Sequence, residues 1–374
     1  MTQPYDKISP EMKARYLAAS PYNLVRVILP ADYALAAGHL NDWIRDGILA
    51  QDAKAGFYAY AQDFDVPDTG ERASRLGFIG IGKVEDYAAQ VVFRHEQTLA
   101  GPKKDRLELL RHTRAHCGHI FMLYAEPERA IDRLLEASAQ GPPAMDVMDE
   151  YQARHRLWAV TDAATIARLQ ALMADKKLLI ADGHHRYETA LAYRNENPGD
   201  AAAEFVMMTC INMHSPGLKI LATHRVLRNL AGFDASELVA GTRRLDSLAE
   251  LKGEFATPRP ERVRIGVAVR DGLYLIERPR GAGELDVPVL HTEILAGKLG
   301  IGEEAVRNES YITYVRGLDA AIAEVRDKGA QVAFLLEPTP IDEMARIAFG
   351  GGVMPQKSTD FYPKLLTGVT IYKL

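Results

Sequence analysis

The sequence places a dense group of polar side chains at one strand-to-helix corner. An apolar run ends at Asp182 and Gly183, and a helical pattern begins with His184, His185 and Arg186. The first turn of a helix carries unpaired N–H groups and the positive end of the helix dipole, which together favour an anion. Arginine can hold phosphate through two hydrogen bonds, and histidine can donate or carry a proton near neutral pH. The corner therefore predicts a phosphate-binding site.

Two residues of this corner are also candidates for the chemistry itself. Asp182 could hold Mg²⁺ or accept a proton from a substrate hydroxyl, and His184 is a second candidate catalytic residue. Thr189 is expected to contact phosphate, and Glu188 is a secondary candidate. The alternative is that Asp182 is only the N-cap of the helix. Zinc is a weaker alternative, because His184 and Glu188 are four residues apart but the chain has no H-E-x-x-H motif.

A second polar group follows another predicted strand. Its members are Arg94, His95, Glu96 and Thr98, and a helix expected to open at Gly101-Pro102 adds Lys104, Asp105 and Arg106. The carboxyl ends of strands are where α/β proteins build sites, so Glu96 is an alternative proton acceptor. Thr98, Lys104 and Arg106 are expected to contact phosphate. The alternative is a solvated, charged helix start.

Two further segments carry weaker signals. His224 and Arg225 interrupt an apolar strand, where a satisfied buried pair and a site role are equally good interpretations. Near the end of the chain, three glycines favour a mobile loop that precedes Gln356, Lys357 and Ser358. Lys357 is expected to contact phosphate and its two neighbours are secondary candidates, although the chain contains no G-x-x-x-x-G-K-[ST] motif.

Strands and helices alternate along the chain and must position these residues. Apolar or alternating segments predict strands at 56–64, 75–87, 88–93, 118–127, 154–160, 178–182, 204–213 and 219–227, with the segment 204–213 central in its sheet. Amphipathic segments predict helices at 8–20, 35–49, 127–140 and 162–175. The pattern restarts near residue 229 with a hairpin at 262–279 that turns at Asp271-Gly272, and with a helix at 289–300. We expect an α/β (mixed α+β) fold with a nucleotide- and phosphate-binding region at 1–228 and an α/β subdomain at 229–374 that carries the glycine loop and a returning strand.

Composition excludes several classes of protein. The 374 residues are 47% hydrophobic and 25% charged with a net charge of −5, so a soluble globular protein is expected and nonspecific nucleic-acid binding is not. The two cysteines lack metal-ligand spacing and are expected to be reduced core residues. The N-terminus has neither a basic nor an apolar leader segment, and we expect a cytoplasmic protein without a membrane partner. The oligomeric state is not predicted.

With these residues in view, the chain resembles the family called domain of unknown function 1015. The motifs that carry the resemblance are PYDKISPE, RHEQTLAGPKKDRLELLR, RHRLWAVTD, LLIADGHHRYETAL and MPQKSTDFYPKLLTG. That family is similar to the ParB/sulfiredoxin superfamily, whose phosphate-gripping corner is matched here by Gly183, His184, His185 and Arg186. The resemblance implies a ParB/sulfiredoxin-like mixed-sheet core, with an Asp-Gly-His-x-Arg corner most like that of kinases acting on free serine.

The resemblance implies a nucleotide-dependent phosphotransferase that uses ATP, ADP or CTP with Mg²⁺ and acts on a small hydroxyl metabolite, with free serine the first candidate. Two alternatives stay open: a nucleotide-hydrolysing switch of ParB type without a DNA-reading domain, and a phosphometabolite-binding module without turnover. Sulfiredoxin chemistry is excluded, because residues 183–186 contain no cysteine. Members of the family that the chain resembles begin with a further strand ahead of the PYD motif, whereas this chain begins three residues before Pro4. An upstream strand is therefore expected to strengthen the nucleotide site.

Overall fold

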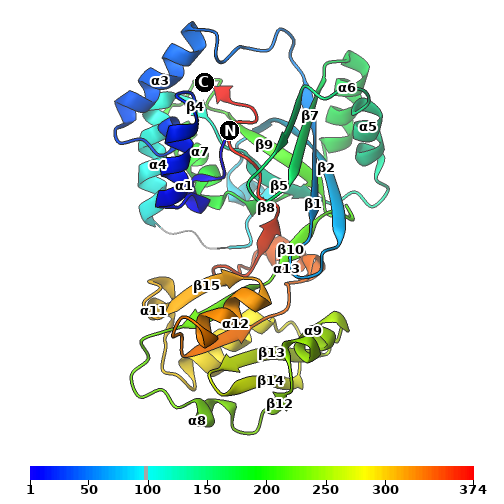
Figure 1. Cartoon of the computed structure of the whole chain (residues 1–374). Coiled ribbons are helices and arrows are strands. Elements are labelled where there is room, and N and C mark those ends of the chain that lie inside the picture. Colours follow the sequence, from blue (N-terminus) through cyan, green and yellow to red (C-terminus); the bar gives the residue numbers. More distant parts are fainter. Residues whose placement is uncertain (97–99) are drawn as a thin grey trace.

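The computed structural model describes the backbone of residues 1–96 and 100–374. Side chains are described for residues 1–96 and 103–374. Figure 1 shows two lobes joined by few segments, with the N- and C-termini together on the first lobe. Each lobe is built on its own sheet, flanked by helices. The expected mixed α/β fold is confirmed.

The first lobe is built on a mixed eight-stranded sheet. In spatial order its strands are β3 (Val92–Phe93), β8 (Leu178–Asp182), β5 (Ile120–Tyr124), β9 (Phe205–Asn212), β2 (Arg72–Lys83), β1 (Phe57–Asp65), β7 (Arg154–Val160) and β6 (Met145–Met148). The pairs β3–β8 and β5–β9 are parallel and the other pairs are antiparallel. Strand β9 is central and buried nearly throughout, as its continuous apolar sequence predicts for a strand covered on both faces.

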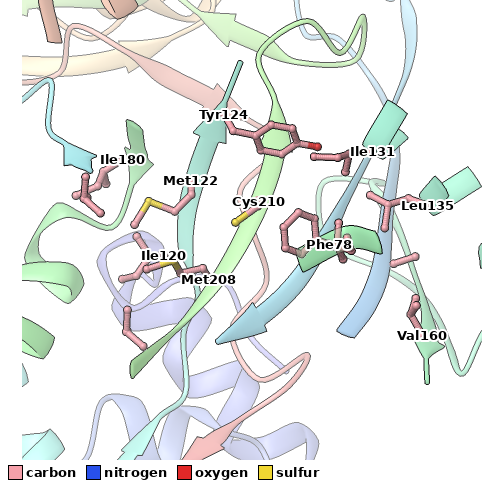
Figure 2. Packing of buried hydrophobic residues seen from close by; sticks show 14 of the residues in the cluster. Phe78, Ile120, Met122, Tyr124, Ile131, Leu135, Val160, Ile180, Met208 and Cys210 are labelled. Atoms are coloured by element: carbon pink, nitrogen blue, oxygen red, sulfur yellow. The ribbon is translucent and has the colours of Figure 1, made fainter. Parts of the chain in front are cut away.

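Helices flank this sheet. They are α1 (Pro10–Ala19), α2 (Val25–Ile28), α3 (Tyr33–Arg45), α4 (Ala100–Thr113), α5 (Ala130–Ser138), α6 (Ala163–Met173) and α7 (His184–Glu196), with 3₁₀ turns at Tyr5–Lys7 and Tyr87–Ala89. Figure 2 shows part of the core on one face, where Phe78 of β2 lies beside Leu135 of α5, and Met122 of β5 and Met208 of β9 lie on adjoining strands. Both cysteines are buried and free, as expected.

The second lobe contains an antiparallel six-stranded sheet in the order β12 (Arg243–Leu245), β14 (Gly272–Pro279), β13 (Arg262–Val269), β16 (Val332–Leu335), β11 (Thr223–Leu227) and β15 (Ile312–Arg316). Its helices are α8 (Ala235–Val239), α9 (Leu248–Ala256), α10 (Asp286–Val289), a π-helix (Leu290–Ala296), α11 (Glu303–Arg307) and α12 (Leu318–Arg326). The hairpin forms as predicted, but its two-residue turn is Arg270-Asp271, one residue earlier than expected.

The end of the chain returns to the first lobe. Helix α13 (Ile341–Phe349) packs against β8 through Met344 and Ala345, β17 (Asp360–Tyr362) pairs with β10 (Lys219–Leu221), and β18 (Tyr372–Lys373) pairs with β4 (Ala115–His116). The division of the chain at residue 228 stays a prediction.

Several sequence-based element boundaries are wrong, including that of the strand expected at 75–87, which ends at Lys83. The strand expected at 219–227 is interrupted at Ala222, so that β10 and β11 belong to different sheets. Of the segment 88–93, only Val92–Phe93 is a strand, because a 3₁₀ turn ending in left-handed Gln90 precedes it. Helix α4 begins at Ala100 rather than at Gly101-Pro102. Within the described part of the chain, none of the helices combines the length and the apolar character that a membrane crossing requires.

Candidate functional site

A cavity of about 650 Å³ lies where the two lobes and the returning C-terminal segment meet. The first lobe contributes the 3₁₀ turn Tyr5–Lys7, Glu96 and residues 182–186, the second lobe contributes β15, and the C-terminal segment contributes residues between 357 and 364. Pockets of this volume are typical of small-molecule sites. We call it the main cavity.

The predicted phosphate corner forms one wall of the main cavity. Strand β8 ends at Asp182 beside an irregularity in its pairing with β5, and α7 begins at His184. The N-cap is Gly183, whose φ of 94° is a conformation that favours glycine, and no side chain caps the helix. The interpretation of Asp182 as the N-cap is therefore wrong. The helix itself offers no partner to the N–H groups of its first turn, and the residues of this turn, 183–186, line the cavity.

Asp182 is held between two cations. One carboxylate oxygen lies 2.8 Å from Arg186 Nη2 and the other lies 3.2 Å from Lys364 Nζ. Burial by itself would raise the pKa of the Asp182 carboxyl, but Lys364, Arg186 and Lys7 outweigh burial and hold this pKa below its usual range. Asp182 is therefore an ionised, fully engaged carboxylate.

These contacts continue into a row of alternating charges. Lys364 Nζ also lies 3.2 Å from Asp360, whose carboxylate accepts a 2.6 Å hydrogen bond from Arg316 of β15. Burial would lower the pKa of Lys364, but Asp182 and Asp360 raise it to about 12, so this ammonium stays charged. The row Arg186, Asp182, Lys364, Asp360 and Arg316 ties α7, the C-terminal segment and the second lobe together.

Glu96 is another carboxyl group of the main cavity, and its pKa is shifted in the direction opposite to that of Asp182. It follows β3, pairs through an isolated bridge with Met354, and accepts a long 3.4 Å hydrogen bond from the backbone N–H of Lys357. Burial raises the pKa of Glu96, and the nearby Lys357 only partly opposes this. Glu96 is therefore a stronger proton acceptor than an ordinary carboxylate.

Two histidines lie directly behind the corner. His95 Nδ1 donates to the carbonyl of Ile180 at 2.8 Å, and His95 Nε2 therefore accepts from the hydroxyl of Thr359 at 2.8 Å. The rings of His95 and His184 meet edge to face at 4.8 Å. Burial lowers the pKa of His95 to about 4 and holds that of His184 well below its ordinary value, so both rings are neutral at pH 7. His184 Nε2 is buried and has no hydrogen-bond partner among the described residues.

Several predicted residues lie outside the main cavity. Arg106 is buried behind α2, donates to the carbonyl of Ile28 at 2.6 Å and pairs with Asp105, which also accepts from Tyr33. Lys104 is exposed on α4. Neither basic side chain is among the residues that line the main cavity, which gives no support to their assignment as phosphate contacts.

Other candidates have structural partners. Thr189 donates to the carbonyl of His185 at 2.7 Å, and Arg94 and Lys103 both pair with Glu188. His224 Nδ1 accepts from the N–H of Leu336, and Arg225 is buried and donates to the carbonyls of Thr223, Gln356 and Lys357. Ser358 donates to the carbonyl of Pro355 at 2.6 Å. Thr98 lies outside the described residues.

Sequence analysis missed several residues of the main cavity. They are Asp6, Lys7, Tyr314, Arg316, Asp360 and Lys364. Lys7 and Lys364 belong to the PYDK and FYPK stretches, where each lysine follows an aromatic residue and a proline. That local pattern was visible, but the ion pair that Lys364 makes spans 182 residues of sequence and left no local signal.

Comparisons with known proteins place the chain in a family. The sequence matches the family described as protein of unknown function DUF1015 over residues 1–320. The chain belongs to this family. No curated protein is similar to it in sequence.

Some solved structures are distantly similar to this DUF1015 chain in fold. One is a mutant free serine kinase in complex with ADP, with 14% sequence identity and a TM-score of 0.40. The alignment covers 76% of this chain and 87% of the kinase chain. A free serine kinase in complex with AMP is 13% identical, with coverages of 76% and 86% and a TM-score of 0.39. A conserved hypothetical protein from Pyrococcus furiosus is 13% identical, with coverages of 77% and 93% and a TM-score of 0.39.

The role of Asp182 as a magnesium ligand stays a prediction for this DUF1015 protein. The described residues bring together no group of three or more histidine, cysteine, aspartate or glutamate side chains that could hold a metal ion. Asp182 already contacts Arg186 and Lys364, one through each carboxylate oxygen, so a metal bound there would share this carboxylate with two cations. No chemical step is therefore assigned to a resident metal.

Gly183 offers a direct test of how the corner of the DUF1015 protein is built. A Cβ at Gly183 would lie 3.0 Å from two guanidinium nitrogens of Arg186, on a backbone with φ of 94°. We expect Gly183→Ala to lower the free energy of unfolding by about 1–3 kcal/mol and to displace Arg186 from Asp182. Urea denaturation measures this loss.

The matched control is Gly253→Ala, within α9, where an added Cβ meets nothing within 4 Å. This substitution should be neutral or stabilise by up to about 1 kcal/mol. Equal stability changes in the two variants would contradict the proposed strain at Gly183.

Proposed function

We propose that the main cavity binds a nucleotide and transfers a phosphoryl group from it to the hydroxyl of a small metabolite, with free serine the first acceptor to test on the family resemblance. The relation to the ParB/sulfiredoxin superfamily is part of this proposal. The support comes from three properties of the cavity: an anion-binding helix end, a set of cations, and one carboxyl group suited to accept a proton.

The helix end and the cations suit a phosphate chain. The first-turn N–H groups of α7 lie beside the guanidinium of Arg186 and the ammonium of Lys364. Lys7 and Lys357 line the same cavity. Such donors stabilise the charge of a transferring phosphoryl group because they are fixed in position before the reaction begins. Mg²⁺ would accompany the nucleotide on its own phosphate oxygens, as it commonly does at such sites.

Glu96 and Asp182 divide the roles that sequence analysis left open. Asp182 is a weak base because two cations hold its pKa down, and it fixes Arg186 and Lys364 beside the helix end. Glu96 has a raised pKa and lies in the same cavity. In the proposed reaction, the acceptor oxygen bonds to the terminal phosphorus, the bond from that phosphorus to the leaving nucleotide oxygen breaks, and Glu96 takes the hydroxyl proton.

The observation that carries the proposal is the presence of the raised-pKa carboxyl of Glu96 and the uncapped end of α7 in one 650 Å³ cavity. The test is a thermal-shift screen with ATP, ADP, CTP and GTP, each with and without Mg²⁺, followed by a transfer assay with serine and other hydroxyl metabolites. A nucleotide at about 100 times its Kd should stabilise the protein by about 2.7 kcal/mol. Binding without any transfer would support the binding-module alternative, and no binding at all would overturn the proposal.

Arg186→Ala should remove most of the nucleotide-induced thermal shift, because the guanidinium orders the phosphate corner. The variant should also be less stable, since Arg186 Nη1 donates to the carbonyl of His119 at 2.5 Å and Nη2 donates to Asp182. Each lost hydrogen bond of this charged kind costs about 1.5–3 kcal/mol. Arg326→Ala, at an exposed arginine of α12, is the control and should leave both quantities unchanged. A folded Arg186→Ala protein with wild-type nucleotide affinity would show that this arginine is not part of the phosphate-binding site.

A further inference from the structure

A second cavity, of about 310 Å³, lies between α6 and the eight-stranded sheet. It shares no lining residue with the main cavity. Its floor is formed by Phe57, Phe78, Met208 and Cys210, three of which Figure 2 shows on adjoining strands, and Met173 of α6 contributes to its wall. We call it the apolar cavity.

Two glycines of β2 give this cavity its aromatic and sulfur-rich lining. Gly80 and Gly82 are two residues apart and therefore face the same side of the sheet. A Cβ on Gly80 would lie 2.5 Å from the ring of Phe57, and a Cβ on Gly82 would lie 2.5 Å from the sulfur of Met208. The missing side chains let Phe57 and Met208 approach the strand closely and leave space beside them, which a well-packed core would fill.

The charges at the rim of the apolar cavity are already compensated. Lys83 pairs with Glu85 at 3.2 Å, and Lys176 pairs with Asp175 at 3.1 Å. A charged ligand would gain little from either lysine and would lose its hydration on entering an apolar space. The lining therefore favours a neutral occupant.

We propose that the apolar cavity is a binding site for a small, neutral aromatic molecule of about two fused rings. The volume supports this size, because a cavity of about 150 Å³ holds one benzene molecule and this cavity is about twice as large. Sulfur atoms of Met173, Met208 and Cys210 and the rings of Phe57 and Phe78 are partners that favour an aromatic ligand over an aliphatic one. This site is independent of the proposed phosphoryl transfer.

Indole is a suitable probe, and methionine methyl groups are suitable reporters. The full-length protein, labelled with ¹³C at its methionine methyls, is titrated with indole, and the signals are assigned with Met173→Leu and Met208→Leu. Ring currents should shift Met173 and Met208, with half-saturation at about 1 mM or below. Met207 is the internal control, because it belongs to the core on the other face of the sheet and should not shift.

Two exposed positions allow the cavity to be closed without disturbing the core. Ala174 and Gln170 are exposed residues that line the cavity, so Ala174→Trp and Gln170→Trp should each raise the half-saturating indole concentration at least about tenfold. Ala171→Trp is the matched control, since Ala171 is exposed on the same helix but does not line the cavity.

The proposal is overturned if indole shifts neither methyl group at about 5 mM, or if it shifts them equally in the two plugged variants and in Ala171→Trp. A stronger response to cyclohexanol than to indole would also overturn it, because the site would then select apolar volume rather than an aromatic ring.

Discussion

Replacing Glu96 by glutamine should lower the rate of phosphoryl transfer by about 10²- to 10⁴-fold while nucleotide binding is retained. The side chain keeps its size and can still accept from the N–H of Lys357, but it can no longer take a proton. The measurement is kcat for transfer together with the nucleotide-induced thermal shift. Glu136→Gln, at an exposed position on α5, is the control and should match wild type in both.

The pH dependence of the wild-type rate tests the same assignment. Burial raises the pKa of Glu96, and the carboxylate is the active form, so the rate should fall as the pH drops through this raised pKa. The rate should begin to fall at a higher pH than it would with an ordinary glutamate as the proton acceptor. In Glu96→Gln this acid-side fall in rate should be absent. If Glu96→Gln transfers at the wild-type rate and Asp182→Asn does not, the proton acceptor is Asp182.

Lys364→Met should destabilise the folded protein by about 3–5 kcal/mol. Lys364 is only 10% exposed and lies between Asp182 and Asp360, so the substitution leaves two carboxylates without their shared cation. Urea denaturation at pH 7 measures the loss. Lys328→Met is the matched control: it also removes a lysine four residues from its acidic partner, but that lysine is 64% exposed, and the loss should be within about 0.5 kcal/mol.

The effect of Lys364→Met should depend on pH in a defined direction. In the wild-type protein the pKa values of Asp182 and Asp360 are lowered: burial alone would raise both, but Lys364 and neighbouring cations outweigh it. A lowered folded-state pKa contributes stability above the unfolded value, near pH 4, and this contribution is lost as the pH falls. The deficit of the variant should therefore be largest near neutral pH and shrink in acid. A deficit that is constant with pH would point to lost packing instead of lost charge pairing.

The sequence indicates local chemistry better than it indicates long-range partners. Asp182 and Arg186 are four residues apart across a strand-to-helix corner, and their proximity could be predicted from turn and helix geometry alone. Lys364 reaches the same carboxylate from the other end of the chain, and no periodicity records this contact. The opposite pKa shifts of Asp182 and Glu96 could not be predicted either, because a pKa depends on which cations the tertiary fold brings near.

Burial explains why the structure gives no support to Arg106 as a phosphate contact. Arg106 resembles a phosphate contact in sequence because it is basic and near a strand end, yet its face of α4 turns toward the carbonyl of Ile28. The strand at 219–227 likewise has a continuous apolar pattern, and only the competing partners on either side of Ala222 divide it between two sheets. In both cases the local pattern is correct and the tertiary environment determines the outcome.

The main cavity is assembled from segments spread over most of the chain: residues 5–7, 96, 182–186, 309–316 and 357–364. During synthesis, the strands of the eight-stranded sheet are all present once residue 212 has emerged, well before the last of these segments exists. A partly synthesised or cleaved chain can therefore contain every strand of the first sheet and still lack Lys364, the second lobe's wall and the helix α13 that packs against β8. On the proposed function, a phosphate ligand would bind only a chain that has all of these segments, and by mass action it would stabilise that chain against proteolysis.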